Sequence, residues 1–306
     1  MHATNAIAGT IYICLTIIMF LLDLMVLVTL LSFNEYATVT YRIIKNMCVA
    51  CMMQLVVFFV GALMTFHNGN FNTTLEKVLG ALEQSAWILY MSLTLALAID
   101  RMLTFVSFHL TSFVSYVLLA VSWLHGGVHF VLLLQPDFTV SYCYAEGECF
   151  LWDYDESPGS KKIDKITAYI ILSIEFAALC CYLVVLYRLI KLQMKKAAGT
   201  SISCYVVEIR IFSVALVGFL YESALIIFLT WGRNMFDTSD VKDIVINITW
   251  ILDAGFFSVI TIAINTPVRR KLVSLIRPSK QIVTAVTSFP ASQSRVENSV
   301  VSTLSE

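Results

Sequence analysis

Five carboxyl side chains stand inside long apolar stretches of this 306-residue chain: Asp23, Glu83, Glu175, Glu222 and Asp253. An ionised side chain at the centre of a bilayer costs roughly 2.5–3.5 kcal/mol or more. Each of these groups must therefore face the protein interior, pair with a partner or stay protonated. The chemistry open to such groups is ligand binding, proton transfer or a structural hydrogen-bond network.

An acid and a base stand side by side near the end of one apolar stretch, LTLALAIDRMLTF, residues 93–105. At a membrane surface Asp100 can neutralise Arg101, and the long arginine side chain can reach toward water. Such a pair serves either as an interfacial anchor or as an electrostatic switch, and taken alone it favours the anchor.

A second informative segment is INTPVRRKLVSLI, residues 264–276, at the end of the last apolar stretch. Pro267 follows Asn265 where the last apolar stretch ends, and proline breaks the hydrogen-bond ladder of a helix. Three bases and an amphipathic segment come next, which predicts a short amphipathic eighth helix along the inner membrane interface.

Composition predicts the elements that carry these residues. The chain is 58% hydrophobic and 13% charged, with a mean hydropathy of +0.81, which indicates a membrane protein. A helix needs about 20 apolar residues to cross a bilayer, and lipid offers the backbone no hydrogen-bond partner. We therefore predict an all-α membrane protein, a seven-transmembrane helix bundle, with spans near 7–33, 46–66, 80–105, 113–135, 166–187, 209–231 and 244–266.

The distribution of basic residues predicts the orientation. With the N-terminus extracellular, 14 of the 20 Lys and Arg residues fall on the cytoplasmic side, including the basic connection 188–204. The acidic loop 136–165 is then extracellular. We predict two parts of the chain: a receptor domain of residues 1–278, and a disordered, cytoplasmic, Ser/Thr-rich tail of residues 279–306.

Two features of the outer loops indicate covalent modification. Cys143 and Cys149 share the 136–165 loop, where disulfides persist, so a local bridge between them is plausible. Asn72 begins the sequence Asn-Thr-Thr, a short motif that predicts glycosylation in a second outer loop.

Seven spans, an extracellular N-terminus, Asp100-Arg101 closing the third span and Asn265-x-Pro267 closing the seventh resemble the G-protein-coupled receptors. TYRIIKNMCVACMMQLVVFFVGALMTF with LEKVLGALEQSAWILYMSLTLALAIDRM looks like nematode serpentine chemoreceptors, most closely class T, over about residues 10–275. The chain departs from the common pattern in several ways. Met102 replaces an aromatic residue, Thr266 separates the Asn from the Pro, the sixth span has no proline, and no cysteine lies at the outer end of the third span.

The resemblance implies a receptor for a small odorant or pheromone that signals through a heterotrimeric G protein. It implies no enzymatic activity and no cofactor, a place in the plasma membrane of sensory neurons, and an arrestin-like partner at the tail. The inner switch would consist of Asp100, Arg101, Asn265 and Pro267. Glu208 stands at the inner end of the sixth span and is our predicted second partner for Arg101.

Glu83 is the first candidate for ligand contact, because it precedes Arg101 by about 27 Å of helix. Trp87 and Tyr90 share its helical face, and Trp250 and Asp253 enter the same outer region from the seventh span. Glu175 and Glu222 complete the predicted ligand-binding set. The alternative for Glu83 is a protonated carboxyl that is hydrogen-bonded to its neighbours. Asp23 and Gln54 are assigned instead to a polar network among spans one, two and seven.

Three other kinds of membrane protein agree less well with the sequence: a transporter, a retinal protein and a metal-dependent enzyme. A transporter or proton-coupled carrier would use the buried carboxylates, but carriers usually show internal symmetry and interrupted spans. A retinal protein needs a Schiff-base lysine in the last span, and residues 244–266 contain none. A metal site at His125 and His129 lacks an evident third ligand.

Overall fold

The computed structural model of the chain describes residues 2–106, 111–143, 151–196, 206–231 and 240–276. The predicted tail lies outside the described residues.

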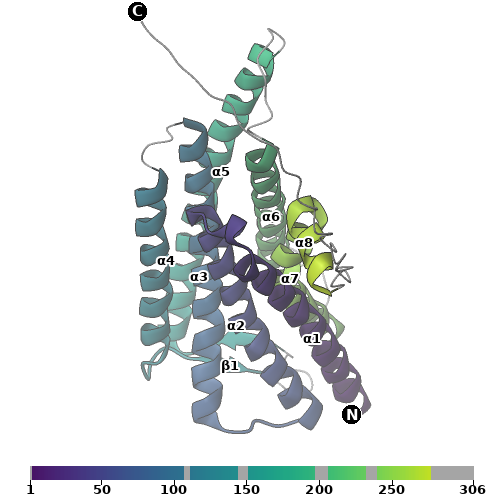
Figure 1. The fold of residues 1–306 in the computed structure, drawn as a ribbon. Helices are drawn as coiled ribbons and strands as arrows, with labels where there is room; N and C mark the ends of the chain where they lie inside the picture. Colours follow the sequence, from purple (N-terminus) through teal and green to yellow (C-terminus); the bar gives the residue numbers. More distant parts are fainter. Residues whose placement is uncertain (1, 107–110, 144–150, 197–205, 232–239, 277–306) are drawn as a thin grey trace, which may run out of the picture.

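Seven helices long and apolar enough to cross a membrane confirm the predicted helix bundle (Figure 1). Most are longer than the apolar stretches that predicted them, because those stretches mark only the part of a helix that lies in hydrocarbon. The spans are α1 His2–Ser32, α2 Val39–His67, α3 Thr73–Val106, α4 Thr111–Leu133, α5 Pro158–Lys196, α6 Val206–Trp231 and α7 Asp240–Ile264.

The start of α3 shows why a helix outruns its apolar stretch. The Oδ1 atom of Asn72 accepts the backbone N–H groups of Thr74 and Leu75, at 2.8 and 3.1 Å. This side-chain cap satisfies donors that the first turn leaves open. The helix therefore begins at Thr73, about two turns before the apolar stretch.

The short eighth helix, α8 Thr266–Ile276, follows α7 directly, as predicted. It buries Val268 and Leu272 and exposes Val273, Leu275 and Ile276. Asn265 assists its start, since its Oδ1 accepts the N–H of Val268 at 3.4 Å.

The third helix is central to the bundle. It packs against α2, α4, α5 and α6, while α1 packs against α2, α7 and α8. The fourth helix is peripheral: in the described part of the chain it packs on α3 and α2 and barely touches α5. The arrangement leaves a gap between α4 and α5 whose floor is α3.

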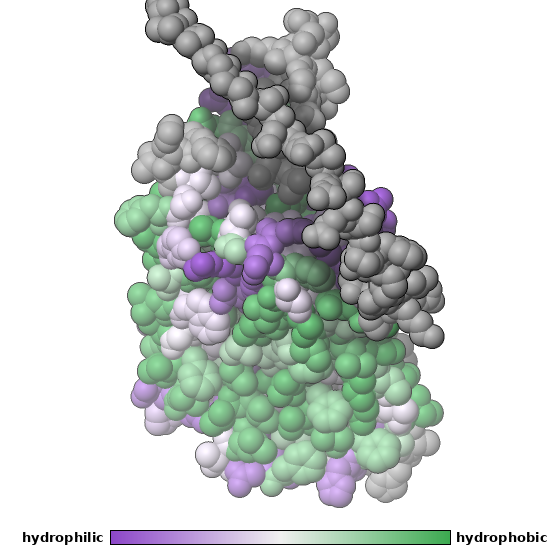
Figure 2. Space-filling model, viewed as in Figure 1, coloured by the Kyte–Doolittle hydropathy of each residue, from purple (hydrophilic) through white to green (hydrophobic). Residues whose placement is uncertain are grey.

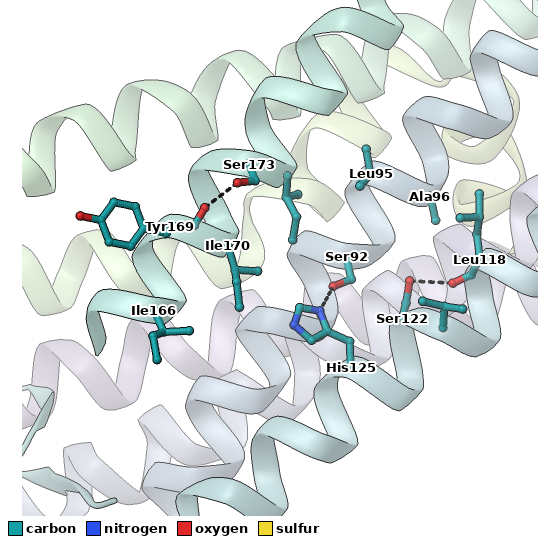
Figure 3. A pocket seen from close by; sticks show the side chains of 12 residues that line it. Ser92, Leu95, Ala96, Leu118, Ser122, His125, Ile166, Tyr169, Ile170 and Ser173 are labelled. Carbon is teal, nitrogen blue, oxygen red and sulfur yellow. Dashed lines mark hydrogen bonds between the residues drawn. The ribbon is translucent and has the colours of Figure 1, made fainter. Parts of the chain in front are cut away.

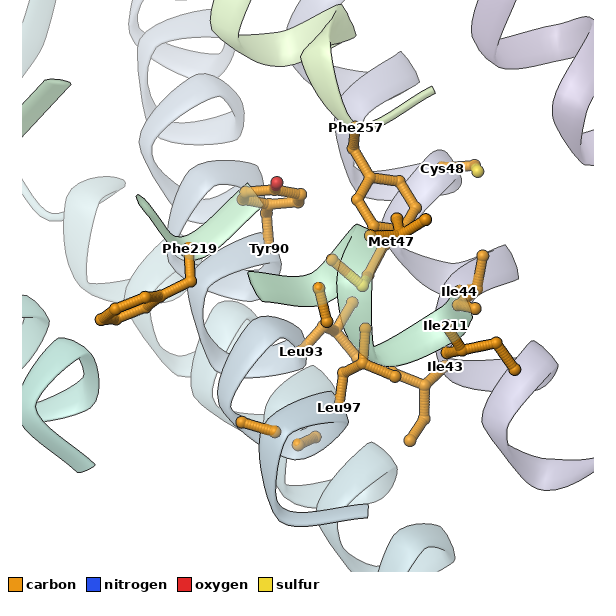
Figure 4. Close-up of a cluster of buried hydrophobic side chains, with 14 of the residues drawn as sticks. Ile43, Ile44, Met47, Cys48, Tyr90, Leu93, Leu97, Ile211, Phe219 and Phe257 are labelled. Atoms are coloured by element: carbon orange, nitrogen blue, oxygen red, sulfur yellow. The ribbon is translucent and has the colours of Figure 1, made fainter. Parts of the chain in front are cut away.

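Apolar side chains fill the bundle and also cover its outside. Figure 4 shows part of the interior, where Met47, Leu93, Ile211 and Phe257 meet from α2, α3, α6 and α7. On the outside, the face shown in Figure 2 is broadly hydrophobic. Large aromatic side chains are also exposed on the helices, among them Phe113 and Tyr169. This surface is the one that faces lipid in a membrane-spanning bundle.

The long 136–165 loop contains a small antiparallel hairpin. We did not predict this hairpin from the sequence. Its strands are β1 Val140–Tyr142 and β2 Trp152–Tyr154, with Val140 opposite Tyr154. A β-carbon on Gly80 would collide with the carbonyl oxygen of Val140, and one on Gly61 would lie 2.9 Å from the ring of Tyr142. Two glycines thus let the hairpin sit directly on α2 and α3.

Candidate functional site

A cavity of about 540 Å³ lies between the hairpin and the ends of the helices beside it. This volume is in the range of sites that hold small molecules. Residues of α2, α3, α5, α6, α7 and the hairpin line it, and those used below are Glu83, Gln84, Trp87, Trp152, Tyr154, Asn247 and Trp250.

Four buried polar atoms on the lining residues have no hydrogen-bond partner in the described part of the chain. Two are acceptors, Oε2 of Glu83 and Oδ1 of Asn247, and two are indole N–H donors, on Trp87 and Trp152. Folded proteins pair nearly all of their buried polar atoms. Four such atoms around one cavity make it the candidate ligand site, because water or a ligand in the cavity would supply their partners.

Aromatic rings form much of the cavity wall. The rings of Trp87 and Trp250 pack edge to face, with centroids 5.3 Å apart. The hydroxyl of Tyr154 donates to Oε1 of Gln84 at 3.4 Å. Burial raises the pKa of Tyr154, so this hydroxyl stays a neutral donor at physiological pH. Such a wall suits a ligand with an apolar body or a cationic group.

The structure divides the seven predicted ligand residues into two groups. Glu83, Trp87 and Trp250 line the cavity. The other four, Tyr90, Glu175, Glu222 and Asp253, are buried but absent from its wall. Tyr90 follows Glu83 by two helical turns, roughly 10 Å, which places it beyond the cavity although it shares the same face.

The deeper group is a carboxyl cluster between α6 and α7. Glu222 and Asp253 lie close enough to interact, and Tyr90 faces Glu222 from α3. Both oxygens of Glu222 and the Oδ1 atom of Asp253 have no hydrogen-bond partner among the described residues. Glu175 completes the cluster from α5 and accepts a hydrogen bond from Ser223 at 2.8 Å.

Asp23 belongs to a separate polar contact within the bundle. Its Oδ1 accepts a hydrogen bond from Ser258, which joins α1 to α7. Gln54 is also buried, on α2. Among the described residues, the predicted network therefore shows one hydrogen bond, between α1 and α7.

The Asp100–Arg101 pair is fully buried at the other end of α3, with 1% and 2% of the side chains exposed. The guanidinium Nη2 lies 2.5 Å from Oδ2 of Asp100, and Nε lies 3.1 Å from it. Thr40 of α2 donates to the same oxygen at 2.8 Å, and Ser115 of α4 donates to Oδ1 at 2.6 Å. The pair joins three helices, so it is more than an interfacial anchor.

Arg101 also lies close enough to Tyr182 of α5 for an electrostatic interaction. The side chain of Glu208, its predicted partner on α6, lies outside the described residues, so that pairing stays a prediction. Asn265 and Pro267 lie at the α7–α8 junction, where Pro267 falls in the first turn of α8. Proline is tolerated there because its missing N–H would have no helical partner.

The modification sites are placed in part. Cys143 is disulfide-bonded, but its predicted partner Cys149 lies outside the described residues. Asn72 is exposed at the start of α3, on a short connection between α2 and α3. The pairing of Cys143 with Cys149 and the glycosylation of Asn72 therefore stay predictions.

Several cavity residues escaped sequence reasoning. Trp152 and Tyr154 lie in the hairpin, and Asn247 lies on α7. Nothing in the spacing of these residues predicts that the 136–165 loop folds back onto α3. The sequence offered one indication that these residues bind a ligand, namely aromatic and amide side chains in a loop or at the end of a span.

No protein-family model matches the sequence, and no curated protein is detectably similar to it. The structure is similar to the crystal structure of squid rhodopsin, with a TM-score of 0.72 over 91% of this chain and 86% of that chain. The two sequences are only 12% identical, so the similarity establishes the fold alone. The chain is a multi-pass membrane protein with that seven-helix fold.

Proposed function

We propose that the protein is a G-protein-coupled chemosensory receptor of the plasma membrane, which binds a small odorant or pheromone in the outer cavity. The observation that carries the proposal is the placement of two sites on one helix. Glu83 lines the cavity near one end of α3, and Arg101 is buried near the other, about 27 Å away along the helix. A rigid helix of this kind can link ligand binding to a response at the opposite membrane face.

The chemistry of the cavity favours a ligand with a hydrogen-donating or positively charged group. The unpartnered oxygen of Glu83 is the acceptor for such a group, and the aromatic rings of Trp87 and Trp250 stabilise a cation nearby. The indole N–H of Trp152 supplies a donor for a second polar group of the ligand. A small amine with an oxygen atom fits these contacts.

The receptor mechanism requires two states that the ligand binds unequally. In the structure Arg101 is held by Asp100, Thr40 supports the pair from α2, and Ser115 supports it from α4. We infer that this is the resting arrangement. A ligand that shifts α3 against α2 and α4 weakens these hydrogen bonds and frees Arg101 to face a G protein.

The test is ligand screening in cells that express the full chain with a promiscuous G protein. Glu83→Gln removes the charge but keeps the size, and we expect amine agonists to lose about 10- to 100-fold in potency, as for a hydrogen bond to a charged group. The matched control is Asp137→Asn, an exposed acid at the same end of the bundle that does not line the cavity.

If amine agonists are equally potent on wild type and Glu83→Gln, Glu83 does not contact the ligand. Absence of any G-protein response, with the protein at the cell surface, would count against the receptor proposal itself. The alternative, a proton-coupled carrier that uses Glu222 and Asp253, then predicts ligand-dependent proton uptake into liposomes.

The tail, residues 279–306, contains ten Ser and Thr residues. We propose that their phosphorylation recruits an arrestin-like protein, because each phosphate adds about −1.5 to −2 charge. A chain truncated after Ser279 should desensitise more slowly than the full chain.

A further inference from the structure

A second hollow of about 620 Å³ lies in the lipid-facing gap between α4 and α5 (Figure 3). Its floor is α3, with Leu95 and Ala96, and its walls include Leu118 of α4 and Ile170 of α5. It opens toward the bilayer, since Tyr169 on its rim is 72% exposed. We call this hollow the lipid-facing groove.

The groove exists because α4 docks on α3 and not on α5. Gly126 brings the two helices close, since a β-carbon there would lie 3.0 Å from Cβ of Leu89. The α5 helix packs on another part of α3 and makes little contact with α4 in the described part of the chain. Two helices held separately on a third leave a wedge that side chains do not fill.

The polar side chains that line the groove are Ser92, Ser122, His125, Tyr169 and Ser173. The hydroxyls of Ser122 and Ser173 donate to backbone carbonyls of their own helices, those of Leu118 and Tyr169. His125 of α4 shares a hydrogen bond with Ser92 of α3, with 2.8 Å between Nδ1 and Oγ. The ring lies between Ser92 and the isoleucines of α5 in Figure 3. Within the described part of the chain, the other ring nitrogen of His125, Nε2, makes no hydrogen bond.

The position of His125 restricts what can occupy the groove. The residue lies roughly 12 Å along the helix from Leu133, the end of α4, and so stands within the hydrocarbon region. A phospholipid acyl chain has no polar atom at that depth. A neutral lipophilic molecule with one hydroxyl or carbonyl oxygen satisfies Nε2 and fills the apolar walls.

We propose that the lipid-facing groove binds neutral lipophilic alcohols or ketones, which reach it through the bilayer. This site is separate from the outer cavity, which is lined by other residues and lies beneath the hairpin. The inference does not depend on receptor signalling.

The experiment uses the full chain in phospholipid nanodiscs and a long-chain alcohol that carries a photoreactive diazirine. We expect the probe to label peptides of α4 and α5 that line the groove. Excess 1-decanol should compete with the probe, whereas decane, which lacks the oxygen, should compete far less.

Three variants test the contacts, and a fourth serves as the control. His125→Leu should reduce labelling about fivefold, as expected for the loss of one hydrogen bond, and His125→Gln should retain more of it. Ser173→Phe places a large ring in the groove from an exposed position of α5 and should reduce labelling more than tenfold. Leu183→Phe, on an exposed part of α5 outside the groove, is the matched control and should change nothing.

Equal competition by decanol and decane would overturn the proposal. It would also be overturned if the His125→Leu and Ser173→Phe proteins were both labelled as strongly as wild type. Crosslinking of the groove to a second copy of the chain would assign the surface to a dimer instead. Because labelling is measured without a G protein, a failure here is distinguishable from a failure of the proposed function.

Discussion

The two ends of α3 differ in how completely their buried polar atoms are paired. In the predicted orientation, the Asp100–Arg101 end of α3 is the inner end and the Glu83 end is the outer end. At the inner end, both oxygens of Asp100 accept hydrogen bonds, from Arg101, Thr40 and Ser115. At the outer end, Oε2 of Glu83 accepts none in the described part of the chain. The same is true of both oxygens of Glu222, deeper in the bundle.

This difference separates a structural role from a binding role. A buried ion pair that is fully hydrogen-bonded is costly to break, because the remaining partner is left as an uncompensated charge. A buried carboxyl oxygen without a hydrogen-bond partner already lowers the stability of the folded protein through lost hydration, so replacing the carboxyl costs little more. We therefore expect changes at the inner end to lower stability and changes at the outer end to affect ligand binding.

The largest effect should come from Asp100→Ala. It leaves the guanidinium of Arg101 buried without the Asp100 carboxylate, and we expect the free energy of unfolding to fall by about 3–5 kcal/mol. The measurement is equilibrium unfolding of the purified protein in detergent. A stability equal to that of wild type would show that the inner pair does not hold the helices together.

Ser115→Ala should have the next largest effect. It removes a donor to a charged group, so we expect a loss of about 1.5–3 kcal/mol. Ser122→Ala is a suitable control on the same helix, since in the described part of the chain the Ser122 hydroxyl donates to the backbone carbonyl of Leu118 and not to a charged group. If both variants lose the same stability, the Asp100 contact contributes nothing of its own.

Glu222→Gln should act in the opposite direction. The side chain is 1% exposed and neither oxygen has a described partner, so the neutral amide should leave stability unchanged or raise it by about 1 kcal/mol. Thermal unfolding measured beside Glu83→Gln checks this. A marked loss in Glu222→Gln would mean that the outer carboxyls are as structural as Asp100.

The smallest effect is expected at the partly exposed ion pair between Lys271 of α8 and Glu35, where Nζ and Oε1 are 3.0 Å apart and Nζ also lies 4.5 Å from the ring centroid of Phe33. Exposed pairs contribute about 0.2–1 kcal/mol because water and salt screen them. Lys271→Ala should therefore change stability by less than any inner-end variant, and added salt should erase the difference. A larger loss would show that α8 is held by this contact and not by Val268 and Leu272.

Sequence reasoning predicted the elements better than the cavity. Apolar length identified all seven spans, and Pro267 with the amphipathic segment after it identified α8. The early start of α3 was missed because Asn72 caps the helix through a side chain, outside the apolar stretch. Hydropathy does not record such a contact.

Within the site, helical spacing predicted which face of α3 a side chain occupies, but not how far along the helix the cavity extends. Glu83 and Trp87, one turn apart, both line the cavity, whereas Tyr90 lies beyond it beside Glu222. Trp152 and Tyr154 were missed because strands of three residues leave no periodic signal. Contacts between distant segments are set by tertiary packing, which local patterns do not encode.

The glycines under the hairpin restrict how the outer cavity can evolve. Gly61 and Gly80 have no room for even an alanine, so substitutions there would lift the hairpin from α2 and α3. Trp152 and Tyr154, by contrast, present side chains to the cavity from a backbone that those glycines hold in place. Diversification toward new ligands is therefore cheapest at these two strand positions, where one substitution reshapes the cavity and leaves the scaffold intact.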